Sequence, residues 1–218
     1  MNDITNKLDN LLSIRKDIIN EISNNIDIIK SKVCPDNIKY ATDFDGLGVF
    51  SPSLVIDKIT GGYKKGRILK NPPKSPKYVK CYYDEKGEIL FFEKYNEFGL
   101  DLTCYFYRIE NVLWVAPFIG DGYKEYPTDV YSMVFDNGKI KDFSYMASNS
   151  IWDEVYRYSE DCQTAECHEY YYVPDKKENQ LLEMKINILL EKDKVKKLEC
   201  FEMIDGMEKL IYKWGFFG

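Results

Sequence analysis

The sequence predicts an α+β protein that is mostly β: a long N-terminal helix packed on a large antiparallel β-meander. Three observations lead to this fold class. Residues 3–33 carry apolar side chains at helical spacing. From residue 77 onward, short apolar runs alternate with turn residues. The chain also holds 18 Tyr, 12 Phe and 3 Trp, residue types that favour strands. The sheet is expected to be an open curved sheet or a partial barrel.

One helix is predicted over residues 3–33. Its apolar stripe follows a spacing of three and four, interrupted only by Arg15, and it consists of Leu8, Leu12, Ile19, Ile22, Ile26, Ile29 and Val33. Pro35 should end the helix, because the residue before a proline avoids helical angles. Further isoleucines at 14, 18 and 28 widen the apolar face. A wide face suits packing on a sheet better than a two-stranded coiled coil, so a monomer is favoured over a helix-mediated dimer.

Residues 35–76 read as irregular chain with a few short edge strands. Glycine and proline are dense here, as in Asp43-Phe44-Asp45-Gly46 and Asn71-Pro72-Pro73, and both residues punctuate loops. The role of this segment stays open at the level of sequence.

Eleven strands are predicted beyond residue 76. Asp84-Glu85-Lys86-Gly87 and Asp136-Asn137-Gly138 stand between apolar runs and indicate tight hairpins. Because sequential strands usually pair, the strands should form a meander. The predicted strands are 78–83, 88–95, 100–109, 112–119, 130–135, 139–147, 151–158, 168–173, 181–190, 195–204 and 207–214. We expect one domain, residues 1–218, made of the helix (1–34), the irregular segment (35–76) and the meander (77–218).

Composition points to a cytoplasmic protein that does not enter membranes. No segment approaches the roughly 20 apolar residues that span a bilayer. The start, Met1-Asn2-Asp3, lacks the basic and apolar stretches of a secretory signal. The six cysteines are therefore expected to be reduced thiols.

The charge of −6 is unevenly distributed. Residues 84–175 carry nineteen acidic and seven basic side chains, which argues against a nucleic-acid binder and permits attraction of a basic protein partner. Residues 58–83 carry eight bases and no acid. These bases could grip phosphate, although the order of a P-loop is absent; lysines also blunt exposed sheet edges.

An acidic stretch interleaved with aromatic residues is the main candidate for a partner-binding surface. Tyr and Trp are favoured interface anchors, and surrounding acids would steer a basic partner. The predicted partner-binding residues are Trp152, Asp153, Glu154, Tyr156, Tyr158, Glu160, Asp161 and Glu166. Glu169 and Tyr170 to Tyr172 belong to the same stretch. The alternative interpretation is a sheet with an aromatic inner face and an acidic outer face.

Catalytic and metal-binding patterns are weak. His168, the only histidine, follows Cys167 and lies near Cys162, but a second paired ligand motif is missing. Cys167 and His168 are neighbours on a predicted strand and should point to opposite faces. Asp43 and Asp45 lack the further oxygen ligands of a calcium loop. We therefore predict no catalytic residues, no metal site and no cofactor.

Three functional hypotheses remain. The first is a non-catalytic protein-binding domain, for example a bacterial cytosolic immunity protein that neutralises a basic toxin enzyme. The second is a small-molecule binder or an enzyme with an aromatic-lined pocket under the sheet; an inward-facing charged group with a perturbed pKa would favour it. The third is an assembly protein that dimerises through the helix or a sheet edge.

Overall fold

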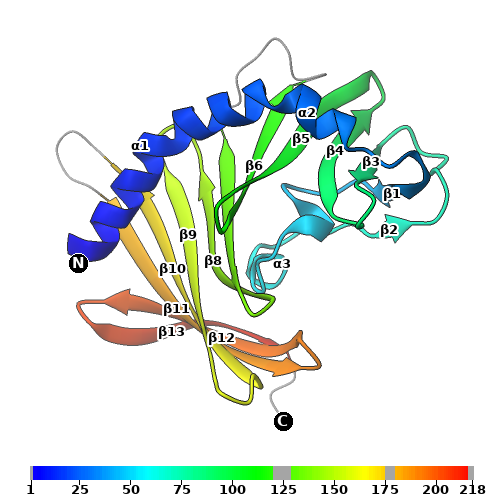
Figure 1. Cartoon of the computed structure of the whole chain (residues 1–218). Helices are drawn as coiled ribbons and strands as arrows, with labels where there is room; N and C mark the ends of the chain where they lie inside the picture. Colours follow the sequence, from blue (N-terminus) through cyan, green and yellow to red (C-terminus); the bar gives the residue numbers. More distant parts are fainter. Residues whose placement is uncertain (1, 120–128, 175–179, 216–218) are drawn as a thin grey trace. The chain divides into compact units, whose positions relative to one another are not determined.

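The computed structural model describes residues 2–119, 129–174 and 180–215. Thirteen antiparallel strands follow the order β13-β12-β11-β10-β9-β8-β7-β6-β5-β4-β3-β1-β2 (Figure 1). The order is that of an open sheet, with β13 and β2 at its ends. It is a meander in which only β1 leaves the sequential order, since it lies between β3 and β2. The predicted fold class, mostly β with an N-terminal helix, is confirmed.

The N-terminal helical segment is broken once, where the sequence predicted one continuous helix. It consists of α1 (Asn2–Asn24) and α2 (Ile26–Ser31). At Asn25 the backbone N–H donates to the carbonyl of Ile22, three residues back, at 3.0 Å. The Asn25 side-chain amide donates to the carbonyl of Glu21 at 2.8 Å. Asn side chains compete in this way with helical hydrogen bonding, and the apolar stripe, which runs unbroken past Asn25, gave no sign of the break.

The irregular segment holds the short strands that were expected. It contains the 3-10 turns η1 (Pro35–Asn37) and η2 (Gly48–Phe50), the one-turn helix α3 (Ile56–Ile59), and the strands β1 (Ile38–Thr42) and β2 (Ile68–Leu69). β1 pairs with β3, and β2 pairs with the outer side of β1.

All eleven predicted strands form. Their bounds are β3 (Tyr78–Tyr83), β4 (Ile89–Asn96), β5 (Gly99–Ile109), β6 (Val112–Ile119), β7 (Val130–Asp136), β8 (Lys139–Met146), β9 (Ile151–Tyr158), β10 (Thr164–Val173), β11 (Gln180–Glu191), β12 (Lys194–Ile204) and β13 (Met207–Gly215). The largest difference is β10, which begins at Thr164 instead of His168, because Ala165 continues the ladder opposite Tyr158. At the predicted β7–β8 turn, Asn137 and Gly138 have φ of 49° and 78°, as a type I′ hairpin requires.

The chain divides into two compact units, which are described separately. Unit 1 comprises residues 1–13, 52–62 and 132–218, and unit 2 comprises residues 14–51 and 63–131. The single domain expected from the sequence stays a prediction. In unit 2, the rings of Phe44, Phe50, Phe92 and Phe106 pack within 5.3–6.2 Å of one another, and α2 lies against β4 and β5.

The central strands of unit 1, β9 and β10, are covered on both faces. On one face, the first turns of α1 contact the strands: Leu8 is fully buried, and Tyr172 on β10 donates to Asp9 at 2.7 Å. On the other face lies the segment of residues 52–62, which includes α3. Its backbone N–H at Leu54 donates to the Tyr156 hydroxyl at 3.1 Å, and its carbonyl at Lys58 accepts from Tyr212 on β13 at 2.9 Å.

Candidate binding pocket

Strand β9 places two consecutive carboxylates on opposite faces of the sheet, and both are buried. Side chains alternate along a strand, so Asp153 faces α1 while Glu154 faces the segment of residues 52–62. Both residues are 0% exposed. A charged group is buried only where hydrogen-bond partners, an opposite charge or a changed protonation state compensate the loss of water. Each of the two carboxylates therefore needs such compensation.

Asp153 is compensated by a cation and a hydroxyl. The Lys7 ammonium lies 2.8 Å from Asp153 and 2.7 Å from Asp142 on β8, and Ser144 donates to Asp153 at 2.6 Å. Burial raises the pKa of Asp142 to about 6, the charge of Asp153 adds to this rise, and Lys7 opposes it. Burial alone would lower the pKa of Lys7, but the two aspartates outweigh it and the pKa is raised.

Glu154 is compensated by hydroxyl donors and has no cation among its described hydrogen-bond partners. Ser53 donates to it at 2.9 Å and Tyr156 at 2.5 Å. Burial raises the pKa of Glu154 to about 7, and the donors Tyr156, Ser53 and Trp152 oppose the rise. The indole N–H of Trp152 lies close enough to Glu154 to lower that pKa, but its geometry falls short of a hydrogen bond.

The predicted acidic and aromatic surface therefore needs correction at three positions. Asp153, Glu154 and Tyr156 lie in the interior and offer no surface to a partner. The prediction assumed that one face of β9 is exposed to solvent. In the structure, α1 packs on one face and the segment of residues 52–62 packs on the other, so both faces are buried. Trp152 is half-buried. The remaining predicted residues, Tyr158, Glu160, Asp161 and Glu166, keep at least partial exposure at the β9–β10 turn and its flanking strand ends.

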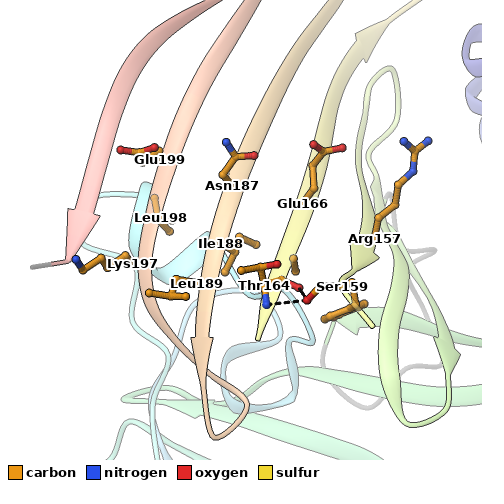
Figure 2. A pocket seen from close by; sticks show the side chains of 12 residues that line it. Arg157, Ser159, Thr164, Glu166, Asn187, Ile188, Leu189, Lys197, Leu198 and Glu199 are labelled. Atoms are coloured by element: carbon orange, nitrogen blue, oxygen red, sulfur yellow. Dashed lines mark hydrogen bonds between the residues drawn. The ribbon is translucent and has the colours of Figure 1, made fainter. Parts of the chain in front are cut away.

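A groove of about 650 Å³ lies beside that turn, and Tyr158 and Glu166 are both among the residues that line it. Figure 2 shows Arg157, Glu166, Asn187 and Glu199 projecting from four neighbouring strands on the same side. Lys185 and His168 hold Glu166 at 3.2 and 2.8 Å, and the His168 hydrogen bond is the largest cause of its lowered pKa. The groove is lined by two acids and two bases, since Arg157 and Lys197 accompany Glu166 and Glu199. It is thus not an acidic surface.

A second cavity, of about 430 Å³, surrounds a different carboxyl group, and we call it the Glu169 pocket. The residues that line it come from β9 to β13 and are mostly apolar or aromatic: Trp152, Glu169, Tyr171, Leu181, Leu182, Glu183, Met184, Glu202, Met203 and Ile211. Glu169 on β10 stands opposite Glu154 on β9 and Met184 on β11, and Met184 stands opposite Glu202 on β12. These side chains therefore share one face of the sheet.

Glu169 differs from the other buried carboxyl groups because it lacks compensation. It is 1% exposed, and neither carboxyl oxygen has a hydrogen-bond partner among the described residues. Burial raises its pKa to about 9, and the charge of Glu154 contributes to the rise. A buried polar group left without a partner costs free energy and calls for an explanation, of which an unseen ligand is one.

Glu169 belongs to the acidic stretch but is not among the predicted partner-binding residues, although the sequence carries a signal for it. Ala165, Cys167 and Glu169 alternate along β10 and all three are buried, so Glu169 occupies a core position in the period-2 pattern. A carboxylate at such a position is a stronger functional signal than the exposed acids nearby.

The remaining sequence candidates serve local structure. His168 lies between Glu166 at 2.8 Å and Glu183 at 3.2 Å, whereas Cys167 is buried on the opposite face. In unit 2, Asp45 accepts from the backbone N–H of Lys64 at 2.7 Å, which is the work of a turn. Within the described ranges, no group of three or more His, Cys, Asp or Glu side chains has the arrangement of a metal site.

Comparison with known proteins does not extend the assignment. No protein-family model, curated protein or solved structure matches the chain. Among the described residues, no helix combines the length and the apolar composition that crossing a membrane requires.

Proposed function

We propose that the chain is a non-catalytic binding protein and that the Glu169 pocket is its ligand site. The observation that carries the proposal is the buried Glu169 carboxyl group, which has no hydrogen-bond partner among the described residues and lines a cavity. It is an inward-facing ionisable group whose pKa is raised by burial, which is the kind of group that favours the small-molecule hypothesis. A ligand that supplies the missing partner would recover the free energy that the unpaired group costs.

The walls of the pocket support a small ligand with an apolar or aromatic body. A volume of about 430 Å³ falls within the usual range of ligand cavities. Trp152 and Tyr171 contribute aromatic side chains on the face of Glu169, and Met184 contributes an unbranched one. Methionine adapts its shape readily, so the Met184 side chain, which stands opposite Glu169, can move to expose Glu169 when a ligand enters.

The test is a fragment screen with a blocked pocket. Leu182 is an exposed residue of β11 that lines the Glu169 pocket, and Leu189 is an exposed residue of the same strand that lines the groove in Figure 2. Small aromatic fragments observed by NMR should bind the wild type and the Leu189→Trp variant, and binding should be lost in Leu182→Trp. If no fragment binds, or if Leu182→Trp binds them all, the pocket is not the ligand site.

A protein-binding role is the second candidate, and the exposed acids at the β9–β10 turn favour it. Glu160 and Asp161 are exposed, and Asp161 is held by Ser159 at 2.7 Å and by the Gln163 backbone at 3.0 Å. In this role the chain would act in the cytoplasm of a bacterium, as an immunity protein that binds a basic toxin enzyme. Rim acids of this kind accelerate association with a basic partner.

A capture experiment tests the second candidate. A basic protein retained from lysate by the wild type at low salt should be lost at high salt and lost by a Glu160→Lys, Asp161→Lys variant. Equal capture by wild type and variant would remove these acids from the binding surface. The Leu182→Trp variant is the matched control, because it should keep this partner while losing small ligands.

A further inference from the structure

We propose that the ligand of the Glu169 pocket is an organic cation: an ammonium group on an apolar or aromatic body. This inference rests on the proposed function and adds the chemical class of the ligand. It rests on the carboxyl groups that face the pocket and on the lack of a basic side chain among the described residues that line it. Two carboxyl groups face the pocket, those of Glu169 and Glu202, and no lysine or arginine is among the described residues that line it.

The carboxyl groups of the residues that line the pocket are not equivalent. Glu183 stands opposite Tyr170 and carries its carboxylate on the other face of the sheet, where it lies 3.2 Å from the His168 ring. Glu202 is half-buried and stands opposite Met184, on the side of the pocket toward the edge strand β13. Glu169 is buried and has no hydrogen-bond partner among the described residues. A cation that enters past Glu202 therefore meets its best remaining acceptor at Glu169.

Other buried acids of the same strands show what compensation looks like in this protein. Asp153 and Asp142 share the Lys7 ammonium at 2.7–2.8 Å. Glu154 receives two hydroxyl donors. Glu169 has neither, and an ammonium ion would supply both a charge and several N–H donors at once. Aromatic faces at Trp152 and Tyr171 would add cation–π attraction.

Binding of a cation should release the proton of Glu169, whereas binding of a neutral molecule should not. Burial holds the pKa of Glu169 at about 9, so near neutral pH the empty pocket keeps this carboxyl group protonated. An ammonium ion prefers the carboxylate and must displace that proton. The apparent affinity for the cation is then low because only a small fraction of Glu169 is ionised. It rises with pH in proportion to that fraction.

Other titratable groups face Glu169 and have to be considered in the pH dependence. On β8 to β13, the titratable and charged side chains on this face of the sheet include Lys139, Lys141, Tyr145, Glu154, Tyr156, Tyr158, Cys167, Tyr171, Cys200, Glu202, Lys209 and Tyr212. The covering segment adds Asp57 and Lys58, which pair with each other at 2.9 Å. Among the groups that contact the pocket or its neighbouring carboxyl, Glu154, with a pKa of about 7, adds a second step to the profile.

The experiment compares two probes of the same shape by calorimetry. These are 2-phenylethylammonium and the neutral 2-phenylethanol, measured at pH 6, 7 and 8. The ammonium group stays charged over this range, because alkyl ammonium ions lose their proton at about pH 10. The affinity for the ammonium probe should rise about tenfold per pH unit, with uptake of a proton by the buffer. The affinity for the alcohol should stay constant.

Two variants make the result specific. Glu169→Gln should abolish the pH dependence and the preference for the ammonium probe while still binding the alcohol. Glu160→Gln, a control at the exposed β9–β10 turn outside the pocket, should keep the pH dependence. Equal binding of both probes, or a preference that survives in Glu169→Gln, overturns the cation inference and leaves the pocket as a neutral-ligand site. If neither probe binds, the inference also falls, and the fragment screen decides separately on the pocket.

Discussion

At the scale of single residues, this protein compensates neighbouring buried carboxyl groups in three different ways. Asp153 has a cation, Glu154 has hydroxyl donors, and Glu169 keeps its proton. The pKa values of about 7 for Glu154 and about 9 for Glu169 follow this order of decreasing compensation. The difference arises because residues from outside the meander, Lys7 and Ser53, reach only the first two. The proposed ligand would supply the positive charge and the hydrogen-bond donors that no described residue provides for Glu169.

The Lys7 ammonium is predicted to be the most important single charge in unit 1. Replacing it in Lys7→Met leaves Asp142 and Asp153 close together without a cation, and should lower the free energy of unfolding by about 2–3 kcal/mol, as for other partly buried ion pairs that lose one partner. Urea denaturation at pH 7 measures the change.

Two controls belong to this measurement. Lys77→Met removes an exposed ion pair with Glu97 and should leave stability nearly unchanged. Adding Asp153→Asn to Lys7→Met should restore part of the loss, because the pair is coupled. Equal effects of Lys7→Met and Lys77→Met would show that the buried pair contributes no more than a surface one.

At the scale of elements, the strands could be predicted from the sequence and their cover could not. Residues 151–158 have the predicted bounds of β9 because apolar and aromatic residues recur there and turn residues follow. Nothing within these eight residues indicates that Asp153 and Glu154 are both buried. That depends on Lys7, 146 residues away, and on Ser53, 101 residues away. Contacts at such separation have no local pattern from which to infer them.

The segment of residues 52–62 is predicted to depend on one hydroxyl group. Ser53 donates to Glu154 and accepts from the backbone N–H groups of Val55 and Ile56 at 3.3 and 3.1 Å, where α3 begins. Ser53→Ala should cost about 1–2 kcal/mol, because it leaves buried polar groups without partners, and should speed amide hydrogen exchange in α3. Ser31→Ala, which removes an exposed hydroxyl contact to Ile28, should change neither. Unchanged exchange in Ser53→Ala would contradict the anchoring role.

At the scale of the whole molecule, local sequence patterns were sufficient to predict the meander but not the candidate site. Hairpin turns such as Asn137-Gly138 and period-2 runs such as β11 specify each strand and its neighbour, so the strand order followed. The candidate site required knowing which acids are buried. The predicted surface combined exposed acids, such as Glu160, with buried ones, such as Asp153, because they lie in one conspicuous stretch of sequence. Glu169 is distinguished by its core position, two residues after the buried Cys167. The division into two units likewise has no signature in composition.

The stability of the molecule should decrease as pH rises from 5 to 9, and this is the last prediction. Burial raises the pKa of Asp142 to about 6, of Glu154 to about 7 and of Glu169 to about 9. Between the ordinary carboxyl pKa and these values, the folded chain holds protons that the unfolded chain releases. The contribution of these three groups to the free energy of unfolding is therefore fully present below pH 4 to 5. It is lost as the pH rises through the pKa of each group in the folded chain.

Each proton difference corresponds to about 1.4 kcal/mol per pH unit, so denaturant unfolding should show a loss of at least about 3 kcal/mol between pH 5 and 9. Glu169 titrates last, and Glu169→Gln should therefore flatten the profile between pH 7 and 9 and be more stable than the wild type there. Glu160→Gln, at an exposed turn position, should follow the wild type. A flat wild-type profile would mean that Glu169 already has a partner when the pocket is empty, and the case for a cationic ligand would lose its physical basis.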